Sequence, residues 1–169
     1  PPLSAQFAND RISDAVEGYI LPTHRTLIDI GCGDGAYTNE IYKRHPNLMI
    51  EGCDPASDAI ALAQKKYPTI TFQVMNILNL EGKREGEVCD VGILRGVLHH
   101  LADQELAIKN ALTLCKTLII IEPNGNNPIL KVIEKVSPYH RKHEEQSFSF
   151  HKLKHWCEHA GGVVLHSEY

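Results

Sequence analysis

Short apolar runs alternate with helical patterns along this chain, and this alternation constrains the fold more than any other feature of the sequence. Several of the runs are unbroken, such as "LIII" at 118–121, and show no in–out alternation. Unbroken apolar runs are typical of strands that are covered on both faces, as in a parallel sheet. The candidate strands are Thr26–Ile30, Leu48–Cys53, Ile70–Met75, Val91–Leu94, Thr117–Ile121 and Val163–Ser167.

Helical patterns separate most of these candidate strands. Their order along the chain predicts an α/β fold, a doubly wound and mostly parallel sheet with helices on both faces. Nothing follows Val163–Ser167 to pair with it as a hairpin, so we expect either six strands or a sheet whose last antiparallel strand is missing. The expected helices are Gln6–Ile20, Tyr37–Arg44, Ser57–Tyr67, Asp103–Leu114 and His151–Ala160.

Length and composition fit one globular domain. The chain has 169 residues, of which 43% are hydrophobic and 22% charged, an ordinary balance for a soluble domain. The net charge of −4 lacks the basic surplus expected of a general nucleic-acid binder. No apolar run approaches the roughly 20 residues that span a bilayer, and no signal-peptide pattern begins the chain, so a cytoplasmic location is expected. The five scattered cysteines never form C-x-x-C, which favours buried thiols over zinc ligands or disulfides.

A glycine-rich turn follows the first candidate strand. The residues "GCGDGA" match G-x-G-x-x-G/A through Gly31, Gly33 and Ala36. Glycines allow positive φ and a close approach of backbone to ligand, and the following helix offers free N–H groups. Asp54 follows the second strand, 23 residues after Gly31, where a carboxylate can accept hydrogen bonds from ribose hydroxyls. The pattern indicates an adenosine-bearing ligand, which fits a nicotinamide dinucleotide and S-adenosylmethionine equally well.

Asp29 separates these two ligands by charge. It lies two residues before Gly31, where its carboxylate would repel a pyrophosphate and suit a cationic amino group. S-adenosylmethionine carries an α-ammonium and a sulfonium and no phosphate, so the charge favours it. Asp29 could instead bond N–H groups of the loop, and Asp54 could simply cap the next helix.

The motifs resemble those of class I S-adenosylmethionine-dependent methyltransferases. "LIDIGCGDG" resembles the first motif of that family and "GCDPASDAIALAQKK" the second. "CDVGILRGVLHHL" resembles the segment of the fourth strand, and "LIIIEPNGNNP" that of the fifth. The resemblance covers about Leu27 to Val164 and is most specific at Asp29–Gly35 and Asp54. It implies a Rossmann-like methyltransferase fold and an enzyme that methylates a small molecule.

The resemblance also implies roles for individual residues. The backbone of the glycine turn would approach the methionine part of the ligand, Asp29 would steer its α-amino group, and Asp54 would bind both ribose hydroxyls. Asn76 stands where the family usually has an acidic residue, so it would accept from the adenine amine without charge assistance. The implied ligand-binding residues are Asp29, Gly31, Cys32, Gly33, Gly35, Asp54, Pro55, Asn76, Ile77, Leu94 and Arg95.

Two histidines after the fourth strand are candidates for a catalytic base. Methyl transfer needs a base only where the acceptor must lose a proton, and much of the rate can come from orientation alone. His99 and His100 lie near the expected position of the methyl group, and imidazole is a suitable base near neutral pH. The alternative is a pair of loop histidines that pack against Leu98 and Leu101.

The stretch 124–150 is a long insertion between the fifth strand and the last helix. Insertions after the carboxyl ends of parallel strands often carry function, so we expect 124–150 to contribute to the acceptor site. We interpret the whole chain, 1–169, as one domain that contains this insertion. Tyr139, His143 and Glu144 are the candidate acceptor-binding residues. "HRKHEE" matches no closed metal site well, so no metal is expected.

Two other functions stay open at the level of sequence. One is a non-catalytic module that binds S-adenosylmethionine. This function is compatible with the asparagine at position 76, where the family usually has an acidic residue, and with the lack of an obvious catalytic base. The other is an NAD-dependent oxidoreductase, which Asp29 disfavours. Nucleic-acid methylation lacks support, because "LRGV" follows the fourth strand where an Asn/Asp-Pro-Pro-aromatic signature would stand.

Overall fold

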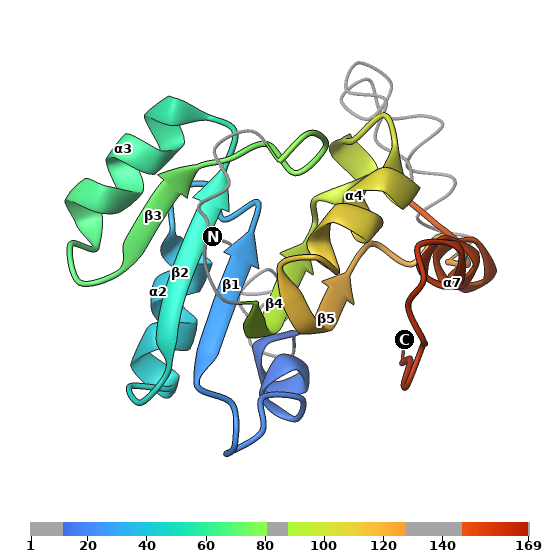
Figure 1. The fold of residues 1–169 in the computed structure, drawn as a ribbon, viewed down its shortest axis with the longest axis horizontal. Helices are drawn as coiled ribbons and strands as arrows, with labels where there is room; N and C mark the ends of the chain where they lie inside the picture. Colours follow the sequence, from blue (N-terminus) through green and yellow to red (C-terminus); the bar gives the residue numbers. More distant parts are fainter. Residues whose placement is uncertain (1–11, 81–87, 128–146, 169) are drawn as a thin grey trace.

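The structure is a computed structural model that describes residues 12–80, 88–127 and 147–168. Its centre is a sheet of five parallel strands in the order β3-β2-β1-β4-β5 (Figure 1). The strands are β1 (Thr26–Ile30), β2 (Met49–Asp54), β3 (Thr71–Val74), β4 (Cys89–Arg95) and β5 (Cys115–Ile121). The first five predicted strands are therefore confirmed, with boundaries that shift by one or two residues.

Helices cover both faces of this sheet, as the doubly wound prediction requires. The short 3₁₀ helix η1 lies between β4 and α4, and residues 12–17 are helical in the described part of the first predicted helix. The helices are α2 (Ala36–Arg44), α3 (Ser57–Lys66), η1 (Leu98–His100), α4 (Gln104–Ala111) and α7 (Phe150–His159).

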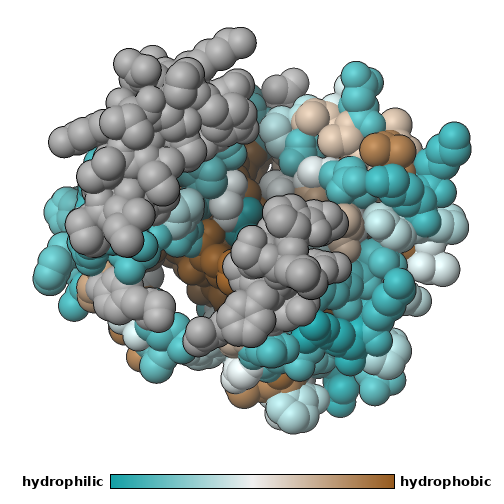
Figure 2. Space-filling model, turned by 180° about the vertical axis from the view of Figure 1, so that it is seen from behind, coloured by the Kyte–Doolittle hydropathy of each residue, from teal (hydrophilic) through white to brown (hydrophobic). Residues whose placement is uncertain are grey.

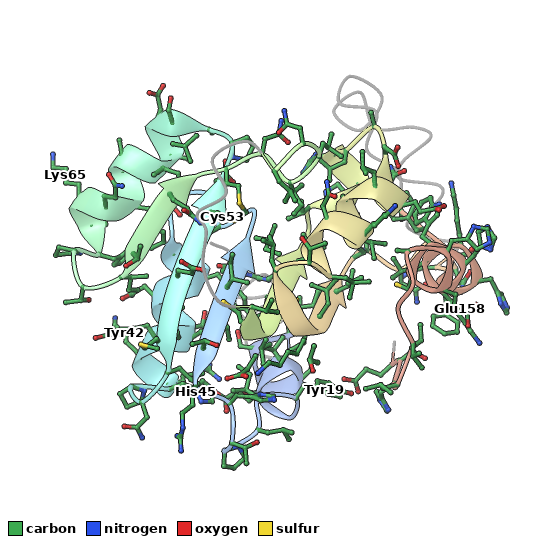
Figure 3. All side chains as sticks on the ribbon, in the orientation of Figure 1. Tyr19, Tyr42, His45, Cys53, Lys65 and Glu158 are labelled. Atoms are coloured by element: carbon green, nitrogen blue, oxygen red, sulfur yellow. The ribbon has the colours of Figure 1, made fainter. Side chains whose placement is uncertain are left out.

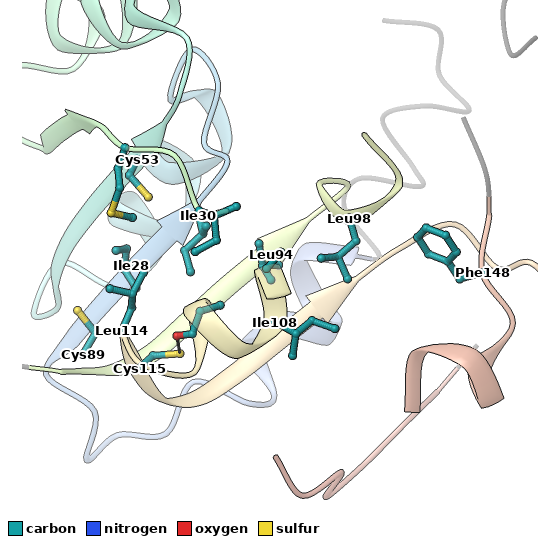
Figure 4. Close-up of a cluster of buried hydrophobic side chains, with 14 residues drawn as sticks. Ile28, Ile30, Cys53, Cys89, Leu94, Leu98, Ile108, Leu114, Cys115 and Phe148 are labelled. Carbon is teal, nitrogen blue, oxygen red and sulfur yellow. Dashed lines mark hydrogen bonds between the residues drawn. The ribbon is translucent and has the colours of Figure 1, made fainter. Parts of the chain in front are cut away.

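Two hydrophobic clusters fill the two sides of the sheet. On one side Ile41 of α2 packs with Leu27, Val91 and Ile93 of the central strands. On the other side Ile108 of α4 packs with residues of β1 and β4 and with Leu98 of η1 (Figure 4). Alternate residues of β1 and β4 face opposite sides and are almost wholly buried on both, which explains their unbroken apolar sequences.

The sixth predicted strand, Val163–Ser167, is wrong. Within the described residues this segment forms no strand, and Val163 and Leu165 are 80% and 84% exposed. A strand gains its stability from a hydrogen-bonded partner and from apolar burial, and this segment has neither in the described part of the chain. The sheet described here is therefore wholly parallel and lacks an antiparallel strand.

The two ends of the predicted insertion lie side by side. The backbone N–H of Gly125 donates to the carbonyl of Phe148 at 2.8 Å, and Asn124 forms a parallel bridge with Phe148. Asn124 and Phe148 therefore lie close together just beyond the carboxyl end of β5. No helix among the described residues combines the length and apolar character needed to cross a bilayer.

Candidate functional site

A pocket opens at the edge of the sheet where the parallel strands end. The chain runs from β1 outward to β3 and then returns to β4, so the strand order reverses between β1 and β4. Ligands of open α/β sheets bind outside the strand ends at such a switch point. The pocket has a volume of about 180 Å³. Its lining comes from segments after four strands: Ile30, Gly31, Asp54, Pro55, Met75, Asn76, Ile77, Gly96, Val97, His100 and Leu101.

The glycine turn meets the end of β2 at this edge. Figure 3 shows Cys53 at that end of the sheet, and the N–H groups of Gly31 and Cys32 both donate to its carbonyl, at 2.7 and 3.0 Å. Gly31 has φ +80°, and a Cβ there would lie 2.4 Å from Val97. Gly35, with φ +77°, would bring a Cβ within 2.7 Å of Phe72. The first and last glycines of the turn are thus required by both conformation and packing.

Asp54 lines the pocket and is held by two backbone donors. Its Oδ2 accepts from the N–H of Gly33 at 3.0 Å, and its Oδ1 from Ala56 at 2.8 Å. The N-cap of α3 is Ala56, without a side-chain cap, so Asp54 is not the N-cap residue that the alternative interpretation supposed. Each carboxylate oxygen has two lone pairs, so acceptor capacity toward the pocket is left. The remaining acceptor sites fit two ribose hydroxyls as donors.

Asp29 lies behind the pocket. It is 2% exposed, and its Oδ2 accepts a hydrogen bond from the hydroxyl of Thr38 at 2.6 Å. Burial raises the pKa of this carboxyl to about 6, while the Thr38 hydrogen bond and the charge of Arg95 act in the opposite direction. Asp29 does not line the pocket, and its predicted role toward an α-amino group stays a prediction.

The other ligand-binding candidates divide into two groups. Pro55, Asn76 and Ile77 line the pocket with Gly31 and Asp54, on the side expected for adenine. The Oδ1 of Asn76 accepts from the N–H of Leu78 at 3.0 Å, so one of its lone pairs is occupied by its own loop. The remaining candidates lie outside the pocket lining: Cys32, Gly33, Gly35, Leu94 and Arg95.

Packing explains the position of most residues in this second group. Leu94 is fully buried in the core, and Gly33 contributes the N–H that Asp54 accepts. Burial raises the pKa of the Cys32 thiol, which leaves it neutral and suits a packing residue. The guanidinium of Arg95 stacks over the ring of Tyr37, 4.2 Å from its centroid, on the side of the sheet that α2 covers.

The two histidines occupy different places. His100 lines the pocket, whereas Nδ1 of His99 lies 2.7 Å from Oε2 of Glu122. Their rings are in contact, with centroids 4.0 Å apart and planes tilted by 45°. No carboxylate partner for either histidine is evident in the sequence. In the structure, Glu122, which directly follows β5, contacts His99. The only signal in the sequence is that Glu122 directly ends the apolar run "LIII".

Other pocket residues also escaped the sequence analysis. Ile30, Met75, Gly96, Val97 and Leu101 line the pocket, and each belongs to an apolar or loop segment without a chemical signature.

The acceptor candidates Tyr139, His143 and Glu144 lie outside the described residues. Over the described ranges, no group of three or more His, Cys, Asp and Glu side chains is arranged to hold a metal ion. Hydrophobic surface lies at the bottom of a hollow on the rear face (Figure 2).

The sheet topology defines a Rossmann-like α/β protein with a pocket at its switch point. Residues 28–117, more than half of the chain, match a family described as methyltransferase domain. The chain belongs to this methyltransferase domain family. The match begins in β1, ends in β5 and contains every pocket residue.

Curated relatives match shorter segments. A putative methyltransferase, 235L of Invertebrate iridescent virus 6, is 39% identical over 59 residues, which cover 35% of this chain and 22% of the relative. The trans-aconitate 2-methyltransferase of Acidovorax ebreus strain TPSY is 32% identical over 75 residues, covering 43% of this chain and 29% of that protein. These matches thus span less than a third of each relative's length.

Solved structures show the same fold. The plantazolicin methyltransferase BpumL, in complex with a pentazolic desmethylPZN analog and SAH, superposes with a TM-score of 0.72 at 17% identity, over 94% of this chain and 63% of that one. An O-methyltransferase family protein from Burkholderia thailandensis gives a TM-score of 0.73 at 22% identity, over 96% and 53% of the two chains. At these identities the likeness concerns the fold.

Proposed function

We propose that this protein binds S-adenosylmethionine in the switch-point pocket and transfers its methyl group to a small-molecule acceptor. The observation that carries the proposal is the position of Asp54 beside Gly31 in the pocket lining. A carboxylate with spare lone pairs at the end of β2 and a close backbone approach after β1 match the ribose and methionine parts of this ligand. The SAH in the complex of BpumL supports the same choice.

The pocket residues have distinct parts in this proposal. Asp54 would hold the ribose hydroxyls, and Asn76 and Ile77 would border the adenine. Asp29 lies behind the turn, where its charge favours an ammonium over a pyrophosphate. Once bound, S-adenosylmethionine would supply an electrophilic methyl carbon on its sulfonium. An acceptor lone pair would bond to that carbon in line as the carbon–sulfur bond breaks, and S-adenosylhomocysteine would leave as a neutral thioether. The protein then contributes chiefly orientation.

His100 is the histidine placed to serve an acceptor that must lose a proton. It lines the pocket, whereas the Nδ1 of His99 is occupied by Glu122. An exposed imidazole at the pocket is a suitable base near neutral pH. Similarity to relatives named trans-aconitate 2-methyltransferase supports including small carboxylic acids in the first acceptor screen.

Calorimetry with S-adenosylhomocysteine and, separately, NAD tests the proposal. We expect S-adenosylhomocysteine to bind and NAD not to bind. Asp54→Ala should weaken binding about tenfold or more, because it removes the acceptor of two hydroxyl hydrogen bonds. Asp58→Ala, on the surface of α3, is the matched control and should bind like the wild type. Binding of NAD alone would refute the proposal.

We also propose that the chain is one domain in which the insertion at 124–150 contributes to the acceptor site. The support is topological, because the two described ends of the insertion pair with each other just beyond the carboxyl end of β5. Replacing His143 and Glu144 by Ala should impair turnover more than cofactor binding. Equal turnover of the double variant in a methyl-transfer assay would refute this role. Cofactor binding without turnover of any acceptor would favour a non-catalytic binding module.

A further inference from the structure

Glu122 makes a concentrated set of hydrogen bonds behind the pocket. It directly follows β5, and its side chain is 3% exposed. Its Oε1 accepts from the backbone N–H groups of Val97 and Leu98, at 2.9 and 2.7 Å. Its Oε2 lies 2.7 Å from Nδ1 of His99. One buried carboxylate therefore binds three consecutive residues of the turn after β4.

The same turn forms one wall of the pocket. Gly96, Val97, His100 and Leu101 all line it, and the ring of His99 packs against that of His100 at an interplanar angle of 45°. Val97 also packs against the position where Gly31 would carry a Cβ. A shift of this turn would therefore move the pocket-facing side chains relative to the glycine turn and Asp54 on the opposite wall.

The contact with His99 also selects a tautomer. An ionised carboxylate offers only acceptors, so with Glu122 ionised the 2.7 Å contact has Nδ1 of His99 as its donor. The partner of one ring nitrogen fixes the state and orientation of the whole ring. Because the His100 ring packs against it at a centroid distance of 4.0 Å, the orientation of His99 restricts that of the histidine in the pocket.

We propose that Glu122 is a positioning residue, which holds the Gly96–Leu101 wall against the ligand and fixes His99 as its Nδ1-protonated form. The proposal concerns the pocket of the proposed function and rests on it for the ligand. The hydrogen-bond network itself can be tested without any ligand. Glu122 itself is not among the residues that line the pocket.

Glu122→Gln separates the two parts of this role. The amide oxygen can still accept from Val97 and Leu98, whereas the amide nitrogen must face Nδ1 of His99 and donates to it. We therefore expect His99 to change from the Nδ1-protonated to the Nε2-protonated tautomer. Two-bond ¹H–¹⁵N spectra of the imidazoles report this directly, with the His99 signals assigned from a His99→Gln variant. An unchanged His99 tautomer in Glu122→Gln would overturn the proposal.

Binding of S-adenosylhomocysteine tests the wall. Glu122→Ala removes all three hydrogen bonds and should weaken binding about tenfold, whereas Glu122→Gln should stay within about threefold of the wild type. Glu51→Gln, a partly buried carboxylate on β2 that contacts Cys89, is the matched control and should change neither readout. Wild-type affinity in a folded Glu122→Ala variant would overturn the role in positioning.

The two proposals fail in different ways. A wild-type protein that does not bind S-adenosylhomocysteine but shows the tautomer change in Glu122→Gln would refute the proposed function and leave the network intact. If Glu122→Ala does not fold, the amide shifts of Val97 and Leu98 and the His99 tautomer in Glu122→Gln decide the question. In Glu122→Gln, wild-type amide chemical shifts at Val97 and Leu98 together with a changed His99 tautomer would support the proposal. They would show that the side chain holds the turn through one oxygen and sets the His99 tautomer through the other.

Discussion

At the scale of the residue, burial of Asp29 destabilises the charged form of its carboxyl group. Burial raises its pKa from 3.8 to about 6 in the folded protein. The folded state therefore holds this proton more tightly than the unfolded chain does. Folding stability from this group is complete below about pH 4 and is lost as the pH rises to about 6. A charged carboxylate is thus kept in the core at neutral pH, as expected for a functional group.

We expect Asp29→Asn to stabilise the protein at pH 7 by roughly 1–3 kcal/mol. A carboxyl pKa that rises from 3.8 to about 6 on folding corresponds to a free energy in that range. The asparagine oxygen can still accept the Thr38 hydrogen bond. The gain over the wild type should vanish below about pH 4, where the wild-type carboxyl is neutral in both states. Urea unfolding of both proteins between pH 3.5 and pH 7.5 measures this difference.

Asp90→Asn provides a control of opposite sign. The hydrogen bond from Lys116, followed by those from the backbone of Arg25 and Thr26, holds the pKa of Asp90 well below its ordinary value. This carboxylate stabilises the fold above the unfolded pKa and loses that contribution at lower pH. Asp90→Asn should therefore destabilise at pH 7. A destabilised Asp29→Asn at pH 7 would contradict our account of Asp29.

At the scale of the element, α4 links the core to the pocket wall. Its N-cap Asp103 accepts from the N–H of Leu106 at 2.9 Å. Gln104, in the first turn, donates to the carbonyl of Leu101 at 2.7 Å and so holds the end of the η1 turn. Ala107, Ile108 and Ala111 are buried against the sheet. The capping residue thus fixes a helix start that also supports the site.

We expect Asp103→Ala to lower the free energy of unfolding by about 1 kcal/mol, the usual effect of losing a helix N-cap. Asp103→Asn should retain most of the stability, because asparagine is an equally good cap. Urea unfolding at constant pH compares the three proteins. An alanine variant as stable as the wild type would show that tertiary packing alone defines the start of α4.

At the scale of the whole molecule, the strand order predicts where the fold is most stable. β1 and β4 lie inside the sheet, and their residues Leu27, Val91 and Ile93 are fully buried between helices on both sides. β3 is an edge strand of four residues, and 163–168 forms no strand. Backbone amides of buried central strands exchange with solvent only when the whole domain unfolds, whereas amides at edges and in segments without partners exchange through local opening.

Hydrogen–deuterium exchange should therefore be slowest in β1 and β4, at rates set by global unfolding. β3 should exchange faster, and 163–168 within the earliest time points. Mass spectrometry of peptides from each strand measures the order. Strong protection of 163–168 would contradict the described fold, because it would require hydrogen-bonded partners for that segment.

Local sequence was sufficient for the elements whose signals are local. β1 and the glycine turn were predicted because an apolar run and a positive-φ glycine motif each depend on neighbouring residues. Val163–Ser167 has the same β-branched composition but forms no strand, since pairing depends on a partner elsewhere in the chain. The pocket residues Val97 and Leu101 carry no chemical signature, so only the fold shows that they line a site.

The sequence by itself determined a doubly wound α/β fold and the membership of Gly31 and Asp54 in one site. These follow from residue type and spacing, since parallel strands bring their carboxyl ends to one edge of the sheet. Only the tertiary structure decided that Asp29 lies behind the pocket, that His100 faces it, and that Glu122 holds His99. Those contacts join residues from different strands, and their geometry depends on how α2, α4 and the sheet pack together.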